Sequence, residues 1–279
     1  MKGKKVIQPQ LVLIVMANTH DKTLNKGCVK DAKAVQKVFA DICKHVHYDF
    51  SSIEISGSNY NRKNLFTAID SIKLHRKSTH DDVILFYYSG HGFCYEKDSP
   101  RNYPQIDLRA HNNQVKYNKI DFIDKYTENL ATILINLRFN GARINMAIGD
   151  CCNVIIPFPR PKKSANLVYI AKHIMPRAAK RLTKTMFTDE KNVVCLLASS
   201  SQHGQPSLTD LAKGSLFTYH LTKALYDAVV REPKGSQYLP WLKLLDKTAK
   251  QAFKDSKGYD IGGGKPGKQK AVFEVFIDK

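Results

Sequence analysis

The 279-residue sequence has no apolar run that approaches the roughly 20 residues needed to span a bilayer. It is also poor in acidic residues, with 25 Asp and Glu against 44 Lys and Arg and a net charge of +19. Such an excess can mark a nucleic-acid partner, but the basic residues are scattered and no RNA-binding or helix-turn-helix signature is present. We therefore expect no membrane span, and nucleic-acid binding is disfavoured as the main function.

The six cysteines include no Cys-x-x-Cys pair, which argues against a zinc ribbon and gives no sign of a disulfide scaffold. The apolar run 11–17 is short, rich in β-branched residues and followed by polar ones, so it fits a strand better than the core of a signal peptide. We expect free thiols and a cytoplasmic protein.

Apolar runs alternate with segments whose apolar residues recur at helical spacing. We expect strands at 11–17, 52–56, 82–89, 143–149, 192–199 and 271–277, and helices at 27–47, 61–75, 120–136, 214–230 and 238–253. The stretch 93–118 is polar and irregular, typical of a loop or short hairpin. This alternation predicts one α/β domain with helices on both faces of a sheet.

Composition shifts at 157–191, where three prolines precede a basic stretch, so this segment is the best linker candidate. The single domain would then consist of a larger part, 1–156, and a smaller part, 192–279.

Two apolar runs end in reactive side chains. One ends in Ser89-Gly90-His91-Gly92 and the other in Asp150-Cys151-Cys152. In an α/β sheet, ligands bind beyond the carboxyl ends of the strands, so neighbouring strands would bring His91 and a cysteine to the same ligand-binding edge of the sheet. That is the layout of a cysteine-nucleophile hydrolase, and either cysteine could be the nucleophile on this ground alone.

Further segments extend the pattern along the chain. In order they are Gly27-Cys28-Val29-Lys30-Asp31-Ala32, Tyr88-Ser89-Gly90-His91-Gly92, Asp150-Cys151-Cys152, Leu197-Ala198-Ser199-Ser200-Ser201 and Gly214-Ser215-Leu216-Phe217-Thr218. Together they resemble the caspase-fold peptidases, most closely the metacaspase branch. The resemblance implies a three-layer α/β/α sandwich around a mostly parallel sheet of about six strands.

The resemblance places the nucleophile on Cys152 and the catalytic histidine on His91, with Cys151 as a neutral neighbour. The thiolate would attack the peptide carbonyl, and the imidazole would carry the proton to the leaving amine. The amides of Gly92 and Cys152 would hold the oxyanion.

A substrate pocket is implied by the same resemblance. Asp31 and Asp150 would line it, with Cys28 and Ser89 nearby, and two carboxylates suit the side chain of Arg or Lys before the scissile bond. A lysine partner within the protein is the competing explanation for Asp31, which lies on an otherwise apolar helix face.

Two features depart from the metacaspase pattern. Asn153-Val154-Ile155 replaces His-Ser-Gly after the nucleophile. Calcium activation, common in that branch, has thin support, because the loops after the histidine offer only Glu96, Asp98 and Asp107. We therefore assign no metal ligands and expect no required cofactor.

The leading expectation is a monomeric cysteine endopeptidase that cuts proteins or peptides after Arg or Lys and processes itself in the basic linker. The candidate positions there are Arg160, Lys162, Lys163, Arg177, Lys180, Arg181 and Lys184. The alternative is a caspase-like signalling or scaffold module with little or no peptidase activity. Intact His91 and Cys152 favour the enzyme.

Overall fold

A computed structural model describes residues 8–72, 74, 82–96, 103–109, 120–157, 193–210, 212–231 and 241–278. Apart from Pro157, the predicted linker lies outside these residues, as do its seven candidate cleavage positions.

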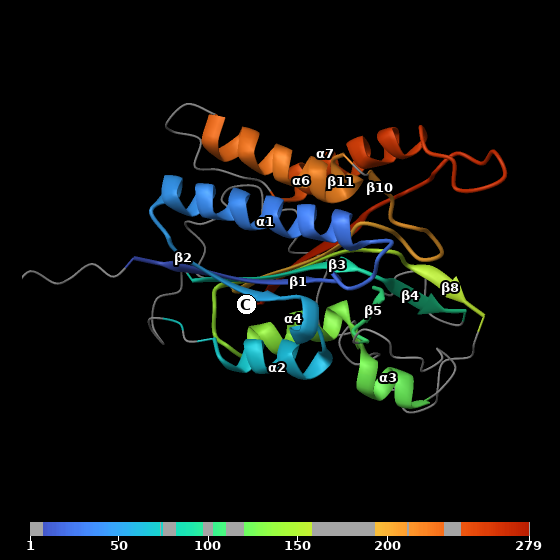
Figure 1. Cartoon of the computed structure of the whole chain (residues 1–279). Helices are drawn as coiled ribbons and strands as arrows, with labels where there is room; N and C mark the ends of the chain where they lie inside the picture. The colour runs from blue at the N-terminus through green and yellow to red at the C-terminus, as the bar shows by residue number, and fades with distance from the viewer. Residues whose placement is uncertain are drawn as a thin grey trace, which may run out of the picture.

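The centre of the fold is a six-stranded sheet in the order β12-β9-β7-β3-β1-β2 (Figure 1). Its strands are β1 (Gln10–Ala17), β2 (Asp49–Ile55), β3 (Val83–Gly90), β7 (Ile144–Cys151), β9 (Val193–Ser199) and β12 (Val272–Asp278). The first five run parallel, and β12 pairs antiparallel with β9. The predicted sheet is therefore confirmed in size and direction.

Helices cover both faces of this sheet, as Figure 1 shows. On one face lie α1 (Asn25–Val46), α6 (Leu216–Tyr226) and α7 (Trp241–Ser256), and on the other α2 (Arg62–Asp70) and α4 (Leu130–Arg138). Because side chains alternate along a strand, Leu13 and Val15 join the first core, while Ile14 and Met16 join the second. A strand buried on both faces must be apolar throughout, which is why β1, β3 and β7 appear as continuous apolar runs.

A smaller sheet lies beyond the carboxyl ends of β3 and β7, in the order β6-β5-β4-β8 (Figure 1). Its strands are β4 (Gly92–Tyr95), β5 (Gln105–Asp107), β6 (Thr127–Asn129) and β8 (Val154–Ile156). The stretch 93–118, expected to be a loop or a short hairpin, contributes to β4 and β5, which pair antiparallel as the strands of a hairpin do.

The prediction of a single helix over 120–136 is wrong. The chain forms α3 (Ile120–Tyr126), breaks to form β6, and resumes as α4. Asn129 explains why a new helix begins here. Its side-chain oxygen accepts a hydrogen bond from the amide of Ala131 at 2.9 Å and caps α4.

The helix expected at 214–230 also begins later, because Gly214–Ser215 forms a two-stranded ladder, β11, with β10 (Thr209–Asp210). After α6 the chain continues as a π-helical turn, Asp227–Arg231. A single 3₁₀ turn, η1 (Gly57–Asn59), precedes α2.

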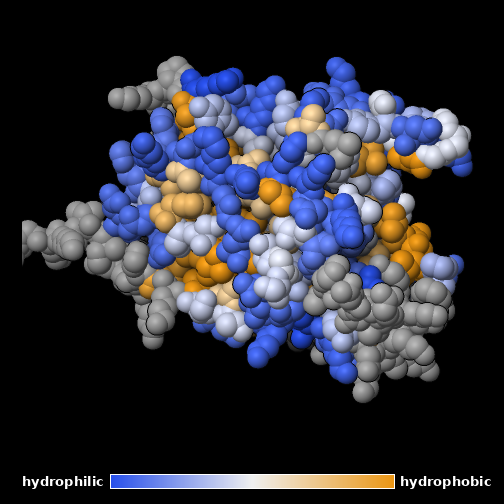
Figure 2. Space-filling model, viewed as in Figure 1, coloured by the Kyte–Doolittle hydropathy of each residue, from blue (hydrophilic) through white to orange (hydrophobic). Residues whose placement is uncertain are grey.

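The face of the molecule seen in Figure 2 is largely hydrophilic over α1 and α7, with hydrophobic side chains gathered near β8. Within the described ranges, none of the helices combines the length and apolar character that crossing a bilayer requires.

The cap at Asn129 predicts a stability effect. Its amide nitrogen also donates to the carbonyl of Tyr103 at 2.8 Å, and the residue is buried. We expect Asn129→Ala to lower the free energy of unfolding by about 2–3 kcal/mol, because a cap and a buried acceptor lose their partners together. Chemical denaturation measures this. Asn140→Ala, beyond the other end of α4, is the matched control and should stay within about 0.5 kcal/mol of wild type; equal losses would contradict the capping role.

Candidate active site

The two reactive strand ends meet at the junction between the two sheets. Gly90 pairs with Cys151 in the central sheet, and Phe93 pairs with Val154 in the smaller one. The register is the same on both sides of the junction, so His91 and Cys152 occupy equivalent positions on neighbouring segments. The pairing therefore places the segments that carry the predicted histidine and thiol side by side.

Gly92 lies against the cysteine segment. A Cβ atom at this position would come within 2.5 Å of the Cys152 carbonyl oxygen and 2.6 Å of the Cys151 sulfur. Any side chain would force the two segments apart, so the close packing of Gly92 against the Cys151–Cys152 segment depends on glycine here.

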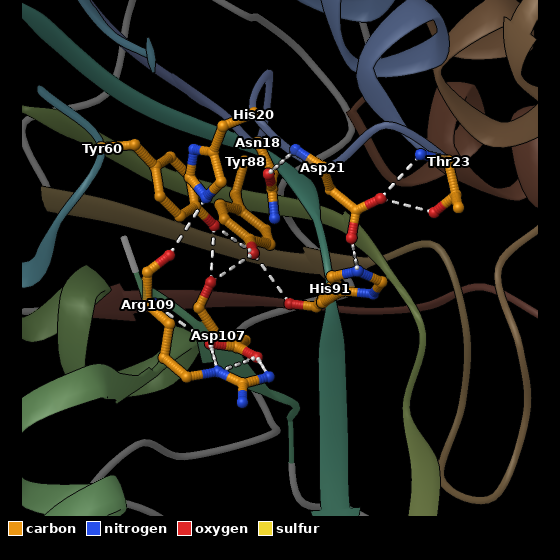
Figure 3. A network of polar contacts seen from close by, with 9 residues as sticks. All are labelled: Asn18, His20, Asp21, Thr23, Tyr60, Tyr88, His91, Asp107 and Arg109. Atoms are coloured by element: carbon orange, nitrogen blue, oxygen red, sulfur yellow. Dashed lines mark hydrogen bonds and ion pairs between the residues drawn. The ribbon is translucent and has the colours of Figure 1, made fainter. Parts of the chain in front are cut away.

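The imidazole of His91 contacts a carboxylate. Its Nε2 lies 2.8 Å from Oδ2 of Asp21, in the loop between β1 and α1 (Figure 3). The other oxygen of Asp21 accepts hydrogen bonds from the amide and the hydroxyl of Thr23, at 2.7 and 2.5 Å. Burial would raise the pKa of Asp21, but the hydrogen bonds from Thr23 and His91 outweigh it and hold that pKa well below its ordinary value.

The backbone of His91 is fixed by buried phenols on the opposite side from Asp21 (Figure 3). The Tyr88 hydroxyl donates to the His91 carbonyl at 2.7 Å and lies 2.8 Å from the Tyr60 hydroxyl, which donates to the Asp107 carbonyl at 2.5 Å. The Asp107 amide donates to the same His91 carbonyl at 3.0 Å. Both the backbone and the ring of His91 are therefore held by defined partners.

The two adjacent cysteines have different environments. Cys151 is 1% exposed and belongs to the core beneath the sheet, and burial raises its pKa well above the ordinary value. Cys152 is partly exposed, and its sulfur accepts a hydrogen bond from the Ser207 amide at 3.3 Å. Burial also raises the pKa of Cys152, against the effect of that amide. This difference favours Cys152 as the reactive thiol.

Among the described residues, the contacts of the Cys152 sulfur are with Ser207 and the ring contact of His91 is with Asp21, and no hydrogen bond joins the thiol to the ring.

Asn153, where the metacaspase pattern has histidine, is fully buried and serves as a pairing position. Its amide donates to the Gln205 carbonyl at 2.9 Å, and its carbonyl accepts from the Gly204 amide at 2.7 Å. The residue thus attaches the segment from 204 to 208 to the strand end that carries Cys152.

Asp31 lies at a buried position beside the junction, only 1% exposed. One carboxylate oxygen accepts from the Ser215 amide at 2.8 Å, and the other accepts from the hydroxyls of Ser89 at 2.8 Å and Ser215 at 2.5 Å. Among the described residues no lysine or arginine pairs with Asp31. The competing explanation, a lysine partner within the protein, is therefore not found among them.

Asp150 is the second buried carboxylate, 3% exposed. It accepts from the Ser207 hydroxyl at 2.7 Å, and from the amide and hydroxyl of Thr218 at 3.0 and 2.6 Å. Burial raises its pKa despite these hydrogen bonds, and burial together with the charge of Asp150 raises the pKa of Asp31 to about 7. Burial likewise raises the pKa of the neighbouring Cys28 thiol to about 12.

The structure therefore brings together two groups of predicted residues: His91, Gly92 and Cys152 at the junction, and Cys28, Asp31, Ser89 and Asp150 beside it. The sequence reasoning missed Asp21, for which the only signal was its place after a strand end. Of the hydroxyl residues that hold the carboxylates, only Ser89 is among the predicted residues; Ser207, Ser215 and Thr218 are not, although Ser215 and Thr218 belong to the segment 214–218 that carries the family resemblance.

The described residues do not form a calcium site. The carboxylate of Asp107 is held by Arg109, with contacts as short as 2.5 Å, and Asp98 lies outside the described residues. Within the described ranges no group of three or more His, Cys, Asp or Glu is arranged to hold a metal ion.

Comparison with known families identifies the family of the chain. The sequence model of the caspase domain family matches residues 10–257, which is most of the chain. The chain belongs to this family of peptidases, and its class is that of a cysteine-type peptidase domain acting on proteins. A search of curated proteins found no match.

The raised pKa of Asp31 predicts a pH dependence of stability. The group titrates at about 7 when folded against an ordinary 3.8, so between these values the folded chain binds more protons than the unfolded chain. The free energy of unfolding should therefore fall as pH rises through this range, by up to about 1.4 kcal/mol per unit.

Urea unfolding at pH 5, 6 and 7 measures this slope. Asp31→Asn should flatten it, because the titrating carboxyl is gone, while Asp246→Asn, at an exposed position of α7, should keep the wild-type slope. A slope that Asp31→Asn leaves unchanged would assign the pH dependence to other groups.

Proposed function

We propose that this chain is a cysteine endopeptidase in which Cys152 is the nucleophile and His91 the acid–base group. The observation that carries the proposal is the shared register, which sets His91 opposite Cys152 with Gly92 against the Cys152 carbonyl. The partial exposure of Cys152, against the core position of Cys151, supports the choice of thiol.

In this mechanism the Cys152 thiol gives its proton to the imidazole of His91. The thiolate attacks the peptide carbonyl carbon, a carbon–sulfur bond forms, and the carbonyl oxygen becomes an oxyanion that the amides of Gly92 and Cys152 receive. His91 then protonates the leaving nitrogen as the carbon–nitrogen bond breaks. Water, deprotonated by His91, releases the acyl group and restores the thiol.

The preference for Arg or Lys before the scissile bond rests on Asp31 and Asp150. Burial is the main cause that raises the pKa of Asp31 to about 7, and the charge of Asp150 adds to it, because two buried carboxylates resist being charged together. A guanidinium or ammonium would relieve that repulsion, whereas an acidic side chain would add to it. The hydroxyls of Ser89, Ser207 and Ser215 now hold the oxygens that the cation would approach.

The domain organisation proposed from the sequence fits a self-processing enzyme. Parts 1–156 and 192–279 both supply the site: Asp31 comes from the first and binds Ser215 of the second, and Asp150 binds Thr218 in the same way. Cleavage between the parts would therefore leave them joined by buried contacts. We further propose the metacaspase branch and a monomer.

Peptide reporters ending in Arg, Lys or Asp, with and without calcium, test this function. We expect the Arg and Lys reporters to be cut and the Asp reporter to be spared. Cys152→Ala should reduce cleavage to background, while Cys151→Ala, the matched control, should retain it. Asp31→Asn and Asp150→Asn should each lower kcat/KM for the Arg reporter by about 10- to 100-fold, the value of a charged hydrogen bond.

Absence of cleavage by the wild-type chain under every condition would refute the enzyme and support the signalling or scaffold module. Preference for the Asp reporter would refute the pocket assignment and leave the nucleophile standing.

Self-processing is tested by incubating the wild-type chain and following its mass. We expect new termini after basic residues between 158 and 191, because this stretch combines cleavable side chains with linker composition. Cys152→Ala should stay intact alone and be cut when wild type is added, if processing also occurs between molecules. An active enzyme whose mass never changes would contradict the proposal.

A further inference from the structure

We propose that Asp21 is the positioning residue for His91, the third member of a Cys152–His91–Asp21 arrangement. This inference rests on the proposed function. Asp21 does not touch the thiol; it acts through the imidazole, whose Nε2 it contacts at 2.8 Å. A nucleophile, its base and a third group that orients the base are the general pattern of activated nucleophiles.

The loop that carries Asp21 is attached to the strand end beside His91. The Asn18 amide donates to the Ser89 carbonyl at 2.9 Å, which fixes the loop at the end of β3, two residues before His91. The Asn18 side-chain oxygen in turn accepts from the Asp21 amide at 3.2 Å. The loop is therefore tied by hydrogen bonds both to the end of β3 and to the imidazole (Figure 3).

The two oxygens of Asp21 have different hydrogen-bond partners. Thr23 supplies two donors, its amide and its hydroxyl, and both go to Oδ1. Oδ2 is left for the imidazole. The side chains of His91 and Asp21 are 41% and 29% exposed, so the pair is open enough for substrate to reach the ring and sheltered enough for its charge to matter.

The direction of this contact decides which ring nitrogen is basic. A carboxylate only accepts hydrogen bonds, so Nε2 must carry the proton that it donates to Asp21. The neutral ring then has its lone pair on Nδ1, and Nδ1 is the atom that takes the proton from Cys152. When the thiol proton arrives, the imidazolium lies against the negative charge of Asp21, which favours the ion pair.

The same geometry predicts that replacing Asp21 with asparagine lowers peptidase activity more than replacing it with alanine. In Asp21→Asn, the two Thr23 donors hold the amide oxygen in the place of Oδ1, and the NH₂ group therefore faces Nε2. That group donates, so it favours the ring with its proton on Nδ1, which cannot accept the proton of Cys152. Asp21→Ala removes the charge without imposing the wrong tautomer, so the isosteric change should be the more harmful one.

Peptidase kinetics test this order. We expect kcat to fall about tenfold in Asp21→Ala and about 100-fold in Asp21→Asn, parts of the 10²–10⁴ that a positioned acid–base group contributes. KM should change little, because Asp21 is not among the pocket contacts of Asp31 and Asp150. The pH profile should also change in Asp21→Ala, because the imidazolium loses the carboxylate that faces it.

Asp41→Asn is the matched control: it removes one carboxylate, 35% exposed and paired with Lys37, from α1. It should leave both the rates and the pH profile at wild-type values. Asp21→Asn activity equal to that of Asp41→Asn would overturn the inference.

A second readout needs no peptidase activity. Two-bond ¹H–¹⁵N correlation spectra of ¹⁵N-histidine-labelled protein, with His91 assigned from the His91→Gln spectrum, report which ring nitrogen carries the proton. We expect Nε2–H in wild type and Nδ1–H in Asp21→Asn. A His91 spectrum that is the same in both would overturn the role of Asp21. Failure of wild type to cleave any reporter would instead refute the proposed function, while the spectra still decide the contact.

Discussion

The site depends on one constraint, the parallel register of β3 and β7 that continues past the edge of the central sheet. Gly90 pairs with Cys151 before the junction, and Phe93 pairs with Val154 after it. Two short strands, β4 and β8, repeat the pairing of the long ones, so the residues between them have little freedom to separate. A histidine and a cysteine in register on such segments stay together without any bond between their side chains.

The second requirement is a buried environment for two carboxylates, which is costly for a charged pair. Hydroxyl groups supply the compensation: Ser89, Ser215 and Thr218 donate to one carboxylate or the other, along with backbone amides. Hydroxyls can rotate, so in the proposed pocket they can release the carboxylates to a substrate cation. A lysine in their place would occupy that pocket itself.

The sequence allowed prediction of those parts of the molecule whose local pattern matches their environment. The strands of the central sheet are apolar on both faces, so the fold could be foreseen, and so could the placement of His91 and Cys152 at neighbouring strand ends. Of the smaller sheet, only a short hairpin at 93–118 could be foreseen as an alternative to a loop, because strands of three or four residues exist only through pairing with one another. Asp21 also follows a strand, but Thr19 and His20 beside it are equally polar, and nothing in the chain marks which one faces His91.

Ser207 joins the reactive centre to the pocket. Its amide donates to the sulfur of Cys152, and its hydroxyl donates to Asp150. Gln269 donates to the same hydroxyl at 3.2 Å and accepts from the neighbouring Leu208 amide at 2.9 Å, which fixes the segment from the far side. Because one residue makes both contacts, the nucleophile and the specificity pocket of the proposed function share Ser207. A displacement of Ser207 would change the surroundings of Asp150 and of the Cys152 sulfur together.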